Sequence, residues 1–144
     1  MKIFCLTLLA AFQISLTAAP KKIGHPSFLS PHARPILAHE GRVFVANTPS
    51  DSLDLIDAKT RKVIRRIPVG IDPVSLALRP DGRELWVANH VSDSVSVIDT
   101  NPESRTYLRV VDTVQDFDLR AKATRFDEPV GIAFANNEKA YVAL

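Results

Sequence analysis

A segment of thirteen residues recurs in this chain at an offset of 42 positions. Residues 45–57 read VANTPSDSLDLID, and residues 87–99 read VANHVSDSVSVID. Eight of the thirteen positions are identical, and at two more a Leu is exchanged for a Val. A period of this length is typical of a supersecondary unit that is repeated because one copy cannot bury its apolar face alone. We therefore expect an array of similar units around a shared core.

The local residue pattern predicts that these units are made of β-strands. Larger apolar residues alternate with small ones at 74–78 (VSLAL) and at 94–98 (SVSVI), which is the period of two that a strand shows. Turn-forming residues such as Pro-Asp-Gly at 80–82 lie between these runs. We expect about four short antiparallel strands in each unit. In the second unit they are expected at about 74–78, 84–89, 94–99 and 107–111.

Glycine and asparagine mark the expected first hairpin turn of each unit. Asp81 and Gly82 favour a hairpin in the second unit because both residue types tolerate a positive φ. Gly41 occupies this place in the first unit. The Asn-Asn pair at 136–137 occupies it in the third unit, where asparagine also suits a left-handed turn.

Two further pairs of polar residues recur at strand ends. Asn47 and Asn89 end the second strand of their units, and their amides are expected to bond the backbone of the following loop. Asp57 and Asp99 end the third strand and are expected to bond the turn that follows. We interpret these four residues, together with Asp81 and Gly82, as supports of the repeat structure.

Units of four strands and about 42 residues are typical of β-propeller blades. The repeats resemble those of YVTN-type, YncE-like propellers, in which an aromatic residue, Val, Thr or Ala, and Asn follow one another. The matching segments are 44–47 (FVAN), 86–89 (WVAN), 73–77 (PVSLA), 80–82 (PDG), 94–99 (SVSVID) and 67–70 (IPVG). The resemblance covers about residues 35–144 and implies an all-β propeller of the WD40/YVTN repeat-like superfamily. No Trp-Asp dipeptide is present, so a WD40 repeat proper is a weaker interpretation.

The N-terminus has the three-part pattern of a secretory signal peptide. Lys2 precedes a mostly apolar run at 3–16, and small residues then lead to an expected cleavage after Ala19. An uncleaved N-terminal anchor is the alternative. The only cysteine, Cys5, lies inside this signal. We therefore expect an exported protein, periplasmic or extracellular, with no membrane span after signal removal.

The expected domain organisation follows from these features. It comprises a signal peptide at 1–19, a Pro-rich linker at 20–34, and a partial propeller at 35–144 with blades at about 35–71, 72–114 and a truncated 126–144. The polar residues 115–125 are expected to be an inserted surface loop, either solvated or in contact with a partner. Because propeller rings close with four to eight blades, we expect an incomplete ring and an N-terminal part of a longer protein.

No motif in the sequence assigns a catalytic reaction. Gly-x-Ser-x-Gly, a CxxCH haem attachment and a phosphate-binding glycine loop are all missing from it. His25, His32 and His39 fall in or beside an irregular Pro-rich segment, which gives no reason for convergence on a metal. Asp51 and Asp93 recur in equivalent loops and are interpreted as turn residues rather than catalytic or calcium ligands. We predict no catalytic, cofactor or metal residue, and no cofactor, which favours a non-enzymatic role.

A run of basic residues is the sharpest local charge feature in a chain of formal net charge +2. It consists of Lys59, Arg61, Lys62, Arg65 and Arg66, at the end of the first unit. Basic residues on an outer strand can prevent edge-to-edge aggregation. The functional alternative is contact with an anionic partner such as DNA, a cell-wall polymer or an acidic protein, although no aromatic residues are interleaved to stack bases.

Together these features predict a binding scaffold whose propeller loops and channel mouth hold a protein or a small-molecule ligand. The family resemblance and the fold also suggest an alternative by analogy. This is a propeller subunit or domain of a periplasmic redox enzyme that works with a c-type cytochrome, or a lactonase-like hydrolase.

Overall fold

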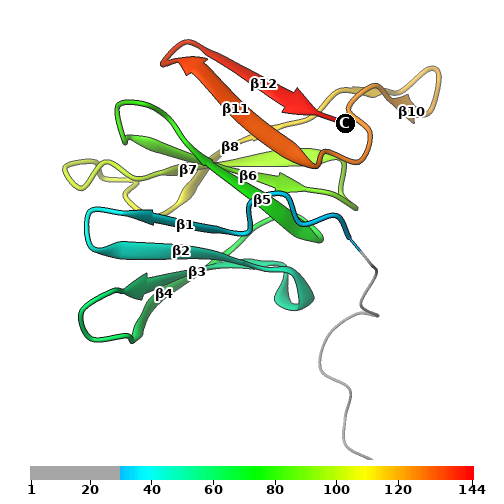
Figure 1. Ribbon diagram of the computed structural model, residues 1–144. Coiled ribbons are helices and arrows are strands. Elements are labelled where there is room, and N and C mark those ends of the chain that lie inside the picture. The colour runs from blue at the N-terminus through cyan, green and yellow to red at the C-terminus, as the bar shows by residue number, and fades with distance from the viewer. Residues whose placement is uncertain (1–29) are drawn as a thin grey trace, which may run out of the picture.

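The computed structural model describes residues 30–144, and the predicted signal peptide and most of the predicted linker lie outside this range. Antiparallel strands dominate the fold (Figure 1). The first sheet has the order β1 (Ile36–His39), β2 (Arg42–Asn47), β3 (Ser52–Asp57) and β4 (Val63–Pro68). The second has the order β5 (Pro73–Leu78), β6 (Glu84–Asn89), β7 (Ser94–Asp99) and β8 (Val110–Val114). The predicted all-β units of four antiparallel strands are confirmed.

The remaining described elements are a 3₁₀ turn and two pairs of strands. The 3₁₀ turn, η1 (Thr48–Ser50), connects β2 to β3. A third sheet pairs β11 (Gly131–Asn136) with β12 (Lys139–Ala143), and a small hairpin pairs β9 (Phe117–Asp118) with β10 (Ala123–Thr124). The segment 115–125, expected to be a loop, therefore carries this hairpin, which projects away from the sheets in Figure 1.

The sequence repeat is also a repeat of strand register. In the first sheet Val45 lies opposite Asp54, and in the second sheet Val87 lies opposite Ser96. Each of these positions differs from its counterpart by the same 42 residues. The two central hairpins are therefore paired alike, so that equivalent side chains point to equivalent faces of their sheets.

The core lies between the first and the second sheet. Leu53 and Leu55 of β3 and Leu76 of β5 are fully buried, and Phe44 of β2 is 3% exposed. Full burial of one such side chain stabilises the fold by about 1.5–3 kcal/mol. These residues alternate along their strands with residues of the opposite face, so one face of each sheet supplies the layer.

The inner strands β1, β5 and β11 lie beside one another, as Figure 1 shows. Arg34, just before β1, forms a parallel bridge with Ser75 of β5, and its carbonyl accepts a 2.9 Å hydrogen bond from the Leu76 amide. On the other side, the Trp86 and Phe134 rings meet edge to face, with centroids 5.2 Å apart. The three sheets therefore pack side by side in the order of the sequence, like the blades of a propeller around its central axis.

The fourth strand of the second sheet begins later than expected. The sequence pattern predicted strand residues at about 107–111, whereas β8 covers Val110–Val114. Asp99 accounts for the difference, because its carboxylate accepts hydrogen bonds from the Asn101 amide and the Thr106 hydroxyl at 2.9 and 2.6 Å. The turn ends with Leu108 in the left-handed region, at φ 57°.

The hairpin turns also differ from the expectation in part. Gly82 is left-handed with φ 73°, whereas Asp81 does not have a positive φ and instead holds the turn through its side chain, which accepts the Arg83 amide. The third hairpin turns without a left-handed residue at 136–137. There the Asn136 side chain accepts the Glu138 amide at 2.8 Å, next to an irregularity in the pairing of β11 with β12. Side-chain bonding therefore replaces the backbone conformation that the asparagines suggested.

We expect Gly70→Ala to destabilise the fold. A Cβ on Gly70 would overlap the Ser92 hydroxyl and lie 2.6 Å from the Asn89 amide, which is fully buried. Relieving this overlap should cost about 1–3 kcal/mol, measured by urea unfolding of the full chain. Gly131→Ala is the matched control, because its Cβ would meet only Ala143, at an ordinary 3.7 Å. Equal stability of the two variants would contradict this packing argument.

Candidate functional site

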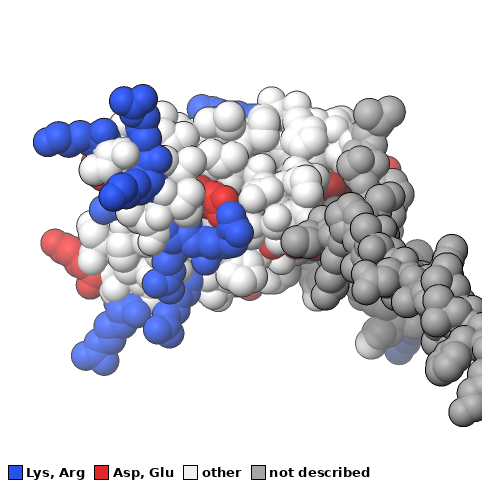
Figure 2. All heavy atoms as spheres, turned by 90° about the horizontal axis from the view of Figure 1, so that it is seen from below, with Lys and Arg blue, Asp and Glu red and all other residues white. Residues whose placement is uncertain are grey.

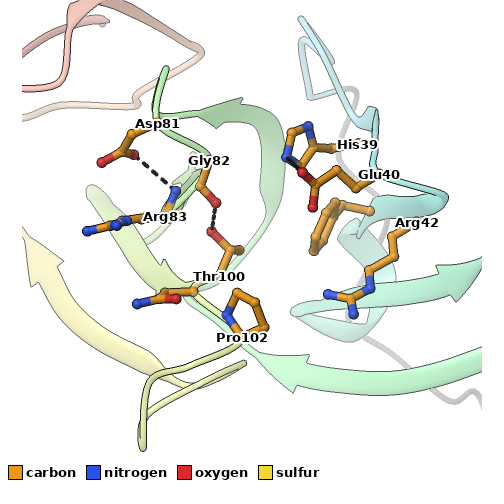
Figure 3. Close-up of a pocket in the computed structure, with 10 residues that line it drawn as sticks. His39, Glu40, Arg42, Asp81, Gly82, Arg83, Thr100 and Pro102 are labelled. Carbon is orange, nitrogen blue, oxygen red and sulfur yellow. Dashed lines mark hydrogen bonds and ion pairs between the residues drawn. The ribbon is translucent and has the colours of Figure 1, made fainter.

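A pocket of about 250 Å³ opens between the first and second sheets at the end where their first hairpins turn (Figure 3). The β1–β2 turn, the β5–β6 turn and the loop after β7 form its walls. The residues that line the pocket come from two blades and include both acidic and basic side chains. They are His39, Glu40, Arg42, Phe44, Asp81, Gly82, Arg83, Thr100, Asn101 and Pro102.

The first sheet supplies a cation, a carboxylate and an imidazole to this pocket. His39 ends β1, and its Nε2 lies 3.8 Å from Glu40 Oε1. Arg42 begins β2, where its guanidinium donates a hydrogen bond to the Tyr107 hydroxyl and its Cζ lies 5.5 Å from the centre of that ring. This cation–π contact holds Arg42 in place.

The second sheet supplies its β5–β6 turn, which hydrogen bonds hold on both sides. Asp81 Oδ1 accepts hydrogen bonds from Arg79 Nε at 2.9 Å and from the Arg83 amide at 3.0 Å. The hydrogen bond from Arg79 lowers the pKa of Asp81 and thereby favours its charged form. Thr100 donates from its hydroxyl to the Gly82 carbonyl at 2.8 Å. The wall at 81–83 is therefore fixed before any ligand arrives.

The two walls nearly touch at Gly82. A Cβ on this glycine would lie 3.1 Å from His39 Nε2, which places the imidazole close to the backbone of the neighbouring blade. Figure 3 shows Glu40 and Arg42 on one side of the gap and Asp81, Gly82 and Thr100 on the other. Such a pocket can bind a polar ligand by hydrogen bonds and ion pairs. No hydroxyl or thiol nucleophile hydrogen-bonded to a base is recorded among these lining residues.

The basic run of the sequence is divided by the structure. Lys59, Arg61 and Lys62 lie in the turn between β3 and β4, and Arg65 and Arg66 lie on β4. Arg66 forms a two-pronged ion pair with Asp54, with distances of 2.6 and 2.8 Å. Among residues 30–144 no ion pair is recorded for the other four side chains. Arg66 is therefore a structural partner, and the others remain candidates for anionic contacts.

The ion pair of Arg66 was not foreseen from the sequence. Asp54 stands where the second repeat has Ser96, and β4 places Arg66 directly opposite it. The hydrogen bond from Arg66 lowers the pKa of the nearly buried Asp54, and Asp54 in turn raises the pKa of Arg66. The exchange of Ser for Asp between repeats was the only sequence signal for this pair.

The aspartates at the ends of β3 and β7 bond the turns that follow them. Asp57 Oδ1 accepts from the Thr60 amide at 2.6 Å, and this backbone bond lowers the pKa of Asp57. Burial raises the pKa of Asp99, but hydrogen bonds from Ser104, Thr106 and Asn101 outweigh it, so the net shift is downward. Both carboxylates are thus occupied by their own turns.

The asparagines at the ends of β2 and β6 bond different partners from those expected. Asn47 Nδ2 donates to Asp54 Oδ2 at 3.3 Å. Asn89 Nδ2 donates to the hydroxyls of Ser94 and Ser96 at 3.2 and 3.0 Å. Their partners are therefore side chains of the next strand rather than loop backbone, because the strand register brings these side chains onto one face.

The recurring aspartates of the β2–β3 and β6–β7 loops connect one blade to the next. Asp51 and Asp93 are both left-handed, with φ of 50° and 48°. Asp51 Oδ1 accepts the Asp72 amide at 2.9 Å, and Asp93 Oδ1 accepts the Glu128 amide at 3.0 Å. Asp72 and Glu128 each precede a proline, which is Pro73 at the start of β5 and Pro129 just before β11. The sequence indicated turn residues here, and the structure adds the link between blades.

His90 of the β6–β7 loop belongs to the second of these links. Its Nδ1 lies 3.1 Å from the Glu128 carbonyl oxygen. The described residues hold no group of three or more His, Cys, Asp or Glu side chains arranged for a metal ion. A bilayer-spanning helix is likewise not found between residues 30 and 144.

Comparison with known proteins identifies relatives of this arrangement. The model of the YNCE-like beta-propeller family matches residues 9–127. Among solved structures, the hydrazine synthase of Kuenenia stuttgartiensis is similar at 31% sequence identity and a TM-score of 0.60, over 83% of this chain and 31% of that one. No curated protein is similar enough to the chain to count as a match.

Two further structures are similar in fold. One is a functionally unknown protein from Desulfotomaculum acetoxidans, with 20% identity and a TM-score of 0.52 over 72% of this chain and 31% of that one. The other is the dihydro-heme d1 dehydrogenase NirN in complex with DHE, with 23% identity and a TM-score of 0.54 over 83% of this chain and 22% of that one. The chain thus spans less than a third of the length of each of these three structures.

We expect Arg66→Gln to lower the urea midpoint of the chain at pH 7, and Arg65→Gln to change it little, because only Arg66 pairs with Asp54. The folded pKa of Asp54 lies below its ordinary value of 3.8, so this stabilisation is present above that pH. It is lost as the pH falls through the folded pKa. The midpoint difference between the two variants should therefore shrink below pH 3.8, and a difference independent of pH would contradict the assignment.

Proposed function

Because the chain belongs to the YncE-like β-propeller family, we propose that it is an exported binding scaffold whose propeller loops hold a ligand. The observation that carries this proposal is the pocket between the first two blades. It combines polar groups of both charges with walls that are already held by hydrogen bonds. Groups that are ordered before binding lose little entropy on binding, which favours a recognition site.

The charges of the pocket support a small polar ligand that carries both signs. Glu40 lies on the same wall as Arg42, and Asp81 lies beside Arg83 on the other. A ligand with a carboxylate and an ammonium group can pair with both kinds of side chain. Phe44, which is almost fully buried, adds an apolar contact. A zwitterion of amino-acid size fits this composition.

The proposed export rests on the signal-peptide pattern at 1–19, which lies outside the described residues. Cleavage after Ala19 would leave Pro20 as the first residue and would remove Cys5. We expect N-terminal sequencing of the protein purified from its native host to start at Pro20. A mature chain that still begins at Met1 would overturn cleavage and favour an N-terminal anchor.

A second candidate function is a propeller subunit or domain of a periplasmic redox enzyme. The 31% identity to hydrazine synthase, over most of this chain, favours it. The absorption spectrum of the natively purified protein separates the two candidates. A haem band that copurifies with the chain supports the redox role, and a colourless protein that binds a ligand supports the scaffold.

We expect a zwitterionic ligand to raise the melting temperature of the full chain. A ligand at a hundred times its Kd stabilises the folded state by about 2.7 kcal/mol, so a panel of free amino acids at millimolar concentration is a suitable probe. Glu40→Gln should abolish the ligand-induced shift, because this exposed residue lines the pocket. Glu138→Gln, in the exposed β11–β12 turn, is the matched control and should keep it. Identical shifts in both variants would exclude this pocket.

A further inference from the structure

A second hollow lies on the outside of the molecule, separate from the pocket described above. It is a groove of about 310 Å³ between β4 of the first sheet and the residues that enter β8 of the second. Ile67, Pro68, Leu108 and Val110 contribute apolar surface to it. We call it the arginine groove, because Arg65 and Arg109 line it from two different blades, together with Arg66.

The cations of the arginine groove are only partly neutralised. Arg66 is paired with Asp54, but no ion pair is recorded for Arg65 or Arg109 within residues 30–144. Lys59, Arg61 and Lys62 extend the positive surface into the β3–β4 turn. Figure 2 shows Lys and Arg side chains gathered on this face, seen from the side of β4. Unpaired cations around a groove attract an anionic partner.

The outer strand β4 offers a free edge beside the groove. It is the last strand of its sheet, so among the described strands only β3 pairs with it. Val63 and Ile64 of β4 are each 53% exposed. Proteins usually protect an exposed strand edge from aggregation by keeping the strand short and charged, with few exposed apolar residues. This edge combines charge with exposed apolar side chains, and an exposed sheet edge can accept an extended peptide as an added strand.

The composition of the arginine groove favours a polypeptide over a nucleic acid. No aromatic residue lines it, so no surface is available there on which bases could stack. Its apolar part instead suits aliphatic side chains, and arginine forms two-pronged hydrogen bonds with carboxylates. The groove therefore offers both apolar contacts and arginines that can pair with carboxylates.

We propose that the arginine groove binds an extended acidic polypeptide, which adds to β4 as a further strand and places its carboxylates on Arg65 and Arg109. Side chains of a strand alternate between its two faces. A segment in which acidic and aliphatic residues alternate can therefore turn its carboxylates toward the groove, where both arginines lie, and its aliphatic side chains toward the other face of β4. This interaction surface goes beyond the pocket between the blades and does not depend on its ligand.

The test uses the full chain and a fluorescent ten-residue peptide of alternating Glu and Val, with binding followed by anisotropy. We expect saturable binding that weakens with salt. The double variant Arg65→Glu/Arg109→Glu should weaken it by about tenfold or more. Arg120→Glu/Lys122→Glu, in the β9–β10 hairpin, changes the net charge equally and should leave it nearly unchanged. Circular dichroism would establish that both variants are folded.

Three comparison probes distinguish the alternatives. A peptide of alternating Lys and Val should not bind. A Glu-Val peptide with N-methylated backbone amides should bind more weakly, since it cannot pair with β4. A single-stranded thymidine oligonucleotide should bind less than the Glu-Val peptide. Tighter binding of the oligonucleotide, equal binding of the N-methylated peptide, equal loss in both charge variants, or no peptide binding would each overturn the proposal.

Discussion

The apolar layer between the first two sheets is the interaction on which the rest of this structure depends. Leu53 and Leu55 from one sheet and Leu76 and Leu85 from the other are fully buried in it. A single four-stranded sheet exposes its apolar face to water, whereas two sheets packed together remove both faces at once. Because this layer fixes how the sheets face each other, it also fixes the spacing of the turns that form the pocket and the separation of β4 from β8.

Polar contacts at the ends of the sheets then determine how the blades are joined. At one end, Asp51 and Asp93 hold the backbone that leads into the next inner strand. At the other end, Thr100 holds the turn at Gly82, which lies against His39 of the preceding blade. Each such hydrogen bond contributes modestly to stability, by about 0.5–1.5 kcal/mol. The loops at both ends are therefore held in place by the repeat itself, and the way the blades connect determines the surface that these loops form.

Much of the fold could be predicted because its determinants are local. The alternation at 74–78 and 94–98, and the turn at Gly82, predict strands and a hairpin from neighbouring residues alone. The later start of β8 could not be predicted, because it depends on which turn groups the Asp99 carboxylate captures. The pairing of Arg66 with Asp54 and the pocket between His39 and Gly82 depend on strand register and on the approach of two sheets. These are relations between distant residues that no local pattern encodes.

The Asp54–Arg66 pair also has a consequence for how the chain folds. Two hairpins as alike as these could exchange outer strands, which is a recognised error of repeat proteins. In the second sheet the equivalent position pairs two neutral residues, Ser96 and Thr113. If β4 were to pair with β7, Arg66 would face a serine, and Asp54 would be left desolvated without its cation, which is strongly unfavourable. The Asp54–Arg66 ion pair therefore favours the pairing of β4 with β3 and disfavours a swapped pairing of β4 with β7.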